Sequence, residues 1–179
     1  MKPSETIAAF DSFLQSRGLV LEAVIVGCAA LELLGVVSRQ TRDCDILHPE
    51  LSPQILAAAA EFAKQRRGEG DLLAGDWLNN GPASLAEVLP DGWQERLQPA
   101  YVGQAITLQS LGRSDLLRSK LFALCDRGTD LQDCVALAPT PEELEELRSW
   151  LEDRDTNELW PEHVAEVLDD LQERLGHGV

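Results

Sequence analysis

Apolar residues recur at helical spacing at the start of the chain and then form an almost unbroken run, which predicts a helix followed by a buried strand. Residues 4–17 place apolar side chains every three or four positions and stop before Gly18, as in an amphipathic helix. Residues 19–26 are almost entirely aliphatic, which is typical of a strand covered on both faces. Gly27 ends this strand, a short helix is expected up to about Gly35, and residues 43–47 predict a second strand.

Proline and glycine divide the remainder of the chain into shorter elements. Pro53 begins an alanine-rich helix that should end near Gly68, and residues 68–93 predict a long, partly irregular excursion. A hairpin about Gly103 is expected from residues 96–102 and 105–108. Four helices should follow, at 114–127, 129–138, 141–153 and 161–175. The pattern predicts an α/β (α+β) fold, with a strand-containing part followed by a helical region.

Charge narrows the functions that the chain can have. The 179 residues carry a formal charge of −16, so a surface adapted broadly to nucleic-acid phosphates or anionic lipid is excluded, and any nucleotide or RNA site must be local. The four cysteines show no CxxC spacing and are expected to be free thiols in a reducing cytosol. No stretch reaches the roughly 20 apolar residues that span a bilayer, so we expect a cytoplasmic protein without membrane contact.

Two aspartates in the second predicted strand are candidate metal ligands. Side chains alternate along a strand, so Asp43 and Asp45 should share one face with their Cα atoms about 6.6 Å apart. Two carboxylates in one small volume repel each other unless a cation lies between them, and Mg²⁺ or Mn²⁺ would supply it. The alternative is a surface turn or a salt bridge to Arg39 or Arg42.

The residues upstream favour the metal site. A strand that ends at Gly27 leads into a helix whose first backbone N–H groups are free to bind an anion, so phosphates could bind beside the metal. The order of strand, glycine turn, short helix and DxD strand resembles the nucleotidyltransferase superfamily that includes DNA polymerase beta-type enzymes. That resemblance implies phosphate contacts at Gly27 and Cys28, and metal ligands at Asp43 and Asp45.

A cationic row is predicted on the first helix of the C-terminal region. Arg113, Lys120 and Arg127 are seven residues apart and therefore lie along one stripe of the helix. Three long side chains at the edge of a packed helix are the simpler interpretation. Lys120, however, is flanked by Leu116 and Leu124, where its ammonium needs a buried carboxylate or a ligand phosphate.

A closer resemblance covers about residues 20–155. The most specific segments are R-T-R-D-x-D, which ends at Asp45, and K-x(6)-R-x(2)-D-x(2)-D, which begins at Lys120. Together they resemble bacterial nucleotidyltransferase-like proteins related to the AbiEii toxins of toxin–antitoxin systems. The resemblance implies a nucleotidyltransferase-like core over residues 1–110 and a helical region over 111–179 packed on it. It also implies that Lys120 contacts phosphate and that Asp130, or as second choice Asp133, is the accompanying acid. Arg42 and Arg127 stand in the same two segments and are further candidate substrate contacts.

Two departures from the superfamily pattern separate two hypotheses. Cys28 stands where a serine is usual, and the segment from Arg96 to Leu108 lacks a third metal-binding acid, for which Asp76 and Glu95 are the remaining candidates. The first hypothesis is metal-dependent transfer of a nucleotidyl group from an NTP to RNA, including tRNA, or to a protein hydroxyl. The second is an inactive relative that binds nucleotide or a protein partner such as an antitoxin.

Overall fold

The strands predicted in the first part of the chain form one mixed sheet, and the predicted α+β fold is confirmed. A computed structural model describes residues 1–176. The chain divides into two compact units, Met1–Gly112 and the residues from Arg113 onward, and each is described by itself below.

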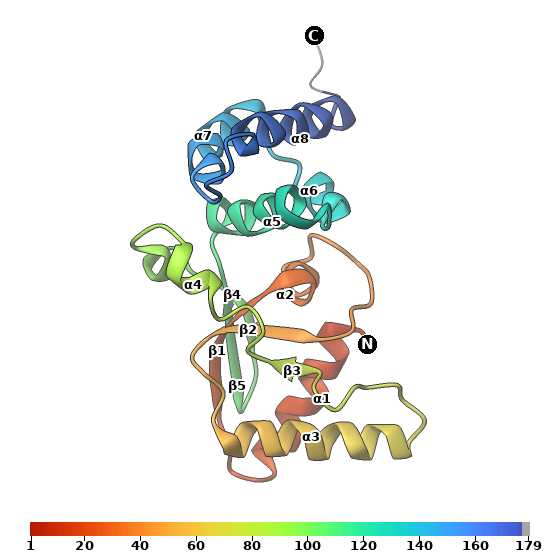
Figure 1. Cartoon of the computed structure of the whole chain (residues 1–179). Coiled ribbons are helices and arrows are strands. Elements are labelled where there is room, and N and C mark those ends of the chain that lie inside the picture. The colour runs from red at the N-terminus through yellow and green to blue at the C-terminus, as the bar shows by residue number, and fades with distance from the viewer. Residues whose placement is uncertain (177–179) are drawn as a thin grey trace. The chain divides into compact units, whose positions relative to one another are not determined.

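The first unit contains the sheet (Figure 1). The strands lie in the order β3-β2-β1-β5-β4, with β1 parallel to β5 and β2 parallel to β3, while β1 pairs with β2 and β4 with β5 in antiparallel fashion. The elements in chain order are α1 (Pro3–Gln15), β1 (Leu21–Val26), α2 (Gly27–Leu33), β2 (Cys44–His48), α3 (Pro53–Gly68), β3 (Leu78–Asn79), α4 (Leu85–Val88), the 3-10 helix η1 (Trp93–Arg96), β4 (Gln98–Val102) and β5 (Ile106–Ser110).

Helices cover one face of this sheet. Alternate strand residues such as Ile25, Ile46 and Leu108 are fully buried against apolar side chains of α1 and α3, including Phe10 and Phe62. The opposite face is more open, because Glu22, Thr107 and Gln109 are exposed there. On that side Val24 and Val26 are nevertheless buried, in agreement with the aliphatic run that predicted a strand covered on both faces.

Two elements of the excursion between residues 68 and 93 were not predicted. β3 has only two residues and α4 only four, which is too short for either to produce a periodic pattern. β3 forms because Cys44 and Asp45 pair with Leu78 and Asn79 in a parallel register. It places Asn79 beside Asp45.

A buried carboxylate holds the hairpin of β4 and β5 against α1. Asp11 is 5% exposed and accepts hydrogen bonds from the backbone N–H groups of Gln104, Ala105 and Ile106 at 3.0, 2.9 and 2.7 Å. A Cβ atom at Gly103 would collide with this carboxylate, so the turn requires glycine. Burial raises the pKa of Asp11, whereas the three N–H groups lower it. The N–H groups together have the larger effect, so the pKa lies below the ordinary 3.8.

Replacing Asp11 by Asn should lower the free energy of unfolding by about 2 kcal/mol at pH 7, because hydrogen bonds to a charged acceptor are lost or weakened. The depressed pKa means that this stabilisation is present above pH 4 and is lost as the pH falls through the pKa of the folded protein. Urea unfolding of both proteins from pH 7 to pH 3 should therefore show a difference that shrinks below about pH 4. A difference that does not change with pH would contradict the charged role. The exposed Asp76→Asn is the control and should change stability by less than about 0.5 kcal/mol.

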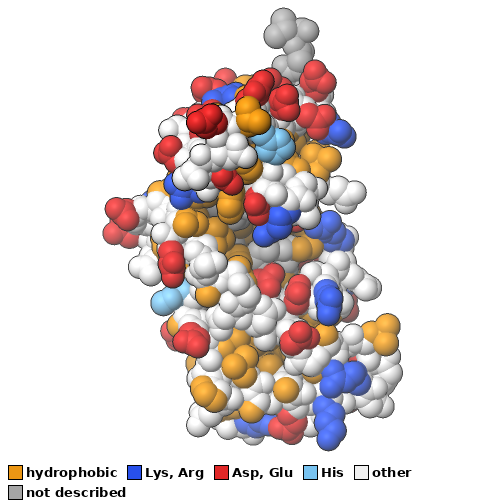
Figure 2. All heavy atoms as spheres, viewed as in Figure 1, with side chains coloured by type: hydrophobic (Ala, Val, Ile, Leu, Met, Phe, Trp, Pro, Cys, Tyr) orange, Lys and Arg blue, Asp and Glu red, His pale blue; other side chains and the backbone are white. Residues whose placement is uncertain are grey.

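The second unit is helical and contains α5 (Arg113–Arg127), α6 (Leu131–Leu137), α7 (Pro141–Glu152) and α8 (Trp160–Arg174). Both α7 and α8 carry proline in the first turn, where the missing N–H costs little, and Thr140 with Glu143 forms a capping box on α7. Their apolar faces bury Leu144, Leu147, Leu151, Val164, Leu168 and Leu171. The outer surface is strongly acidic, as the face of α7 and α8 in Figure 2 shows.

Within residues 1–176 we find no helix with the length and hydropathy required to cross a membrane.

Candidate functional site

The candidate site is built around the glycine turn that joins β1 to α2. Gly27 follows the last residue of β1 and has φ +73°, a conformation that L-residues rarely adopt. An ideal Cβ at this position would lie 3.0 Å from Oδ2 of Asp45. The carboxylate of Asp45 therefore lies directly against the backbone at the start of α2, in space that glycine leaves free.

Strand geometry directs Asp45 away from the main core. Its neighbours Cys44 and Ile46 are fully buried on the helix-covered face, so Asp45, between them, belongs to the opposite face. It pairs with Val26 of β1 and remains half-buried. Asp43 is also half-buried but precedes the first residue of β2, so the strand alternation predicted for the two aspartates applies to Asp45 and not strictly to Asp43.

Two residues near Asp45 were missed by sequence reasoning. Asn79 pairs with Asp45 across the β2–β3 ladder, and its Oδ1 accepts a hydrogen bond from the N–H of Gly81 at 2.6 Å. An ideal Cβ at Gly81 would lie 4.0 Å from Oδ1 of Asp45. The carboxylate thus has a glycine near each oxygen. The Asn-Asn-Gly sequence at 79–81 indicates a turn, but nothing in it indicates that the turn lies beside β2.

A guanidinium lies at the first turn of α2. Arg39 donates a hydrogen bond from Nε to Sγ of the half-buried Cys28 at 3.0 Å. This contact brings positive charge to one of the two residues predicted to contact phosphates. Arg42, which is three residues from Arg39 and is also predicted to contact the substrate, is exposed.

The buried cysteines are unsuited to nucleophilic chemistry. Burial raises the pKa of Cys44 well above its ordinary value, and the charges of Asp45 and Asp43 add to this effect. Burial also raises the pKa of Cys125 to about 11 and, with smaller contributions from neighbouring charges, that of Cys134 to about 12. All four cysteines are free thiols, as predicted.

Asp43 and Asp45 do not belong to a larger metal-binding cluster in residues 1–176, where no three His, Cys, Asp or Glu side chains come together as a metal site. Neither Asp76 nor Glu95, the two candidates for a third acid, therefore completes such a group, and both are exposed. A resident ion held by protein ligands alone does not fit this donor set. Mg²⁺ that arrives with a substrate does fit, because this ion commonly takes one or two carboxylates and completes its shell with water and substrate phosphates.

The second unit holds its own buried charge cluster. Nζ of Lys120, whose side chain is 5% exposed, lies 2.7 Å from Oδ2 of the fully buried Asp133 and 3.1 Å from Oδ2 of Asp130. Asp130 precedes α6 with φ +67°, and its side chain contacts Lys120 in place of capping the helix. Burial lowers the pKa of Lys120, but the hydrogen bond that its ammonium donates to Asp133 and the charges of both carboxylates outweigh this effect and raise the pKa. Of the two partners expected for Lys120, a buried carboxylate or a ligand phosphate, the structure contains the buried carboxylate. Asp133 is the closer of the two aspartates.

The three cations of the predicted stripe have different partners. Arg113 makes a bidentate contact with Glu143, through Nε at 2.6 Å and Nη2 at 2.9 Å. Arg127 is 64% exposed and lies 3.9 Å from Asp126. Only Lys120 is buried, so within this unit the stripe is a set of separate ion pairs.

Comparison with known proteins gives a match to a protein family. Residues 5–162 match the model of a family described as nucleotidyltransferase of unknown function (DUF6036). No curated protein and no solved structure shows significant similarity to the chain.

Proposed function

Because the chain belongs to a family of nucleotidyltransferases of unknown function, we propose that it transfers a nucleotidyl group from an NTP to a hydroxyl of RNA, including tRNA, or of a protein. The observation that carries this proposal is the Asp45 carboxylate packed against Gly27 at the start of α2. This contact supports the proposal because β1 and β2 are adjacent in the sheet, so the carboxylate proposed to bind metal lies close to the backbone N–H groups proposed to bind phosphate.

Asp43 and Asp45 are proposed to hold Mg²⁺, or Mn²⁺, that enters with the NTP. The ion supplies charge stabilisation for the phosphates when it is bound. Asp43 and Asp45 would hold the ion, and substrate phosphates and water would complete its shell, because two carboxylates alone are too few ligands. In the reaction the acceptor oxygen bonds to the α-phosphorus, pyrophosphate leaves, and the hydroxyl proton is released to solvent.

The backbone N–H groups of Gly27 and Cys28 are proposed to hold phosphate oxygens, with Arg42 as a further contact. Support comes from the left-handed Gly27 turn and from the Arg39 guanidinium at Cys28. Cys28 has no hydroxyl to offer, so this part of the site relies on backbone donors and on arginine.

Lys120 and Asp130 are proposed to act as the phosphate contact and its accompanying acid, with Arg127 as a further substrate contact. Support comes from the sequence resemblance and from the local geometry, since two carboxylates keep the Lys120 ammonium charged and fixed. Arg127 is exposed and therefore accessible to a substrate phosphate.

A second candidate function is nucleotide binding without transfer, in the cytoplasm and together with a protein partner such as an antitoxin. It is favoured by the lack of a three-acid cluster in residues 1–176, because superfamily enzymes commonly use a third acid. We propose, together with this second function, that the chain is related to the AbiEii toxins.

The test is incorporation of each of four labelled NTPs into bulk RNA, tRNA and protein, with Mg²⁺, with Mn²⁺ and with EDTA. Metal-dependent labelling of any acceptor supports the transferase. Binding of Mg²⁺–NTP without labelling of any acceptor would reject transfer and leave the binding protein.

A comparison of Gly27 and Gly35, which have the same φ, separates the effect of backbone strain on stability from an effect on ligand binding. Gly27 and Gly35 both have φ +73°, so alanine at either should cost about 1 kcal/mol of stability. Only at Gly27 would the new methyl group meet Asp45, since nothing lies within 4 Å of a Cβ at Gly35. We expect Gly27→Ala to weaken Mg²⁺–NTP binding at least about tenfold in calorimetric titration and Gly35→Ala to leave it unchanged. Equal affinities in the two variants would show that the Gly27 turn is not part of the site.

A further inference from the structure

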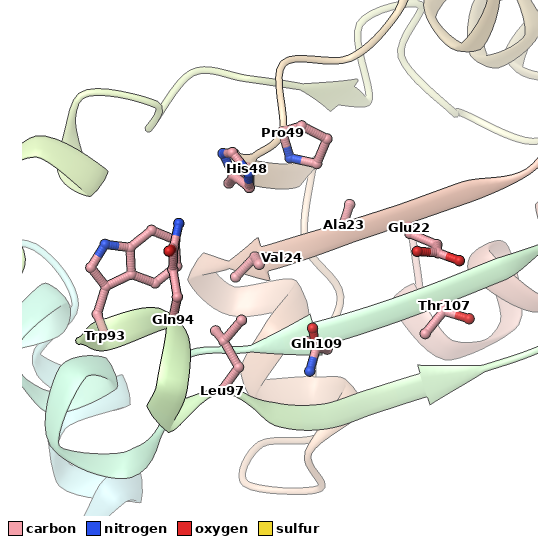
Figure 3. Close-up of a pocket in the computed structure, with 10 residues that line it drawn as sticks. All are labelled: Glu22, Ala23, Val24, His48, Pro49, Trp93, Gln94, Leu97, Thr107 and Gln109. Atoms are coloured by element: carbon pink, nitrogen blue, oxygen red, sulfur yellow. The ribbon is translucent and has the colours of Figure 1, made fainter.

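A hollow lies on the same face of the sheet as Asp45. It measures about 350 Å³ and is lined by β1, β5, η1 and the end of β2 (Figure 3). The β1–β2 register shifts between Val24 and Ile25, which brings His48 opposite Val24. Val24 in turn pairs with Gln109 of β5. This hollow, the open-face pocket, lies within the first unit, and no assigned role involves it.

Its lining suits a flat heterocycle with polar edges. The rings of His48 and Trp93 are 6.4 Å apart at an interplanar angle of 80° and form one side, while Val24 contributes an apolar floor. Gln94 and Gln109 present amides that can both donate and accept. Neighbouring positions add the Thr107 hydroxyl and the Glu22 carboxylate.

The pocket is a poor place for phosphates. No Lys or Arg is among the described residues that line it, and Glu22 would repel an anion. Size also fits a small organic group, because 350 Å³ lies at the lower end of the range for small-molecule sites. A nucleotide would therefore place its nucleoside here and its phosphates elsewhere.

Strand register connects the pocket to the proposed phosphate site. Val26 pairs with Asp45, and Val24 points to the same face two residues earlier, about 6.6 Å along β1. The pocket and the proposed phosphate site therefore lie on the same face of the sheet, two residues apart along β1. Stacking on aromatic rings and hydrogen bonds to amides are the usual means by which proteins hold a base.

We propose that the open-face pocket binds the nucleoside part of the NTP and determines which base is accepted. This proposal rests on the proposed function, because Asp43 and Asp45 supply the site for the phosphates. An acceptor nucleotide or peptide in the pocket is the alternative outcome.

The test compares calorimetric binding of the Mg²⁺ complexes of ATP, GTP, CTP and UTP with that of Mg²⁺–tripolyphosphate to the full-length protein. Gln109→Trp fills the pocket from an exposed position of β5, where an aromatic residue suits a strand. Gln54→Trp, at an exposed position of α3, is the matched control. Thr107→Phe is a second filling variant, and thermal unfolding monitors the fold of all three.

The wild type should bind at least one NTP tenfold or more tightly than tripolyphosphate. Gln109→Trp and Thr107→Phe should remove that advantage and leave tripolyphosphate binding within twofold, whereas Gln54→Trp should change neither. Equal wild-type affinities for NTPs and tripolyphosphate would overturn the nucleoside pocket while the proposed function stands. Loss of acceptor labelling in Gln109→Trp with unchanged NTP affinity would also overturn it and assign the pocket to the acceptor.

If neither an NTP nor tripolyphosphate binds, the proposed function fails. Titration of free nucleosides then tests the open-face pocket independently of the phosphates. A nucleoside that binds the wild type but not Gln109→Trp supports the proposal that the pocket binds nucleosides, and the absence of any nucleoside binding overturns that proposal.

Discussion

Asp45→Asn should lower the rate of metal-dependent nucleotidyl transfer by at least about 10²-fold, the effect seen when one preorganised group that stabilises transition-state charge is removed. Negative charge grows on the bridging and leaving oxygens during transfer, so a weakened metal site affects the transition state more than the binding of the NTP. Asparagine has nearly the same shape as aspartate, so it still fits in the space beside Gly27 that a Cβ atom would otherwise occupy. The rate should be measured under saturating NTP with the best acceptor.

Asp43→Asn is expected to reduce the rate in the same direction, and the exposed Asp76→Asn serves as the matched control that retains it. If Asp45→Asn keeps more than about a third of the wild-type rate, Asp45 is not a metal ligand. Far-UV circular dichroism of the variant excludes unfolding as the cause.

Lys120→Met should lower the free energy of unfolding by about 3–5 kcal/mol, the usual effect of removing one partner of a buried ion pair. The substitution takes away the ammonium 2.7 Å from the fully buried Asp133, and methionine offers that carboxylate no hydrogen bond. Urea unfolding at pH 7 of the full-length protein measures the loss.

Two further variants test whether the loss of stability in Lys120→Met comes from the buried ion pair. Arg127→Met removes a cation that is 64% exposed and 3.9 Å from its nearest carboxylate, so it should change stability by less than about 0.5 kcal/mol. Adding Asp133→Asn to Lys120→Met removes the buried charge and should recover part of the loss. A Lys120→Met protein as stable as the wild type would contradict a stabilising role for the buried ion pair of Lys120 and Asp133.

Much of the fold could be predicted because proline and glycine punctuate it. Pro53, Pro141 and Pro161 mark the first turns of three helices, and Gly27 separates β1 from α2. Each predicted boundary of these elements lies within one or two residues of the observed one. The sheet order β3-β2-β1-β5-β4 was not predictable, because it depends on pairing between strands far apart in sequence.

The candidate site was predictable where it depends on local pattern. The glycine turn and the DxD strand are both readable from short segments, and their contact through Gly27 and Asp45 agrees with the expected arrangement. Asn79 and Gly81 could not be placed, because a two-residue strand has no pattern of its own.

Partners of charged residues were the least predictable feature. Helix geometry placed Arg113, Lys120 and Arg127 on one stripe, but the carboxylates that pair with Arg113 and Lys120 lie outside this helix. Glu143 is 30 residues from Arg113, and Asp130 is 10 residues from Lys120. Burial of Lys120 could be inferred from Leu116 and Leu124, whereas Asp130 and Asp133 were named only through the family resemblance and not through helix geometry.

The most direct test of the proposed site is calorimetric titration of Mg²⁺–NTP into the wild type and into Asp43→Asn/Asp45→Asn, with EDTA in a parallel series. Metal-dependent binding to the wild type is predicted, with at least about a hundredfold weaker binding to the double variant, equivalent to about 2.7 kcal/mol. NTP binding that persists unchanged in EDTA and in the double variant would contradict a metal site at Asp43 and Asp45.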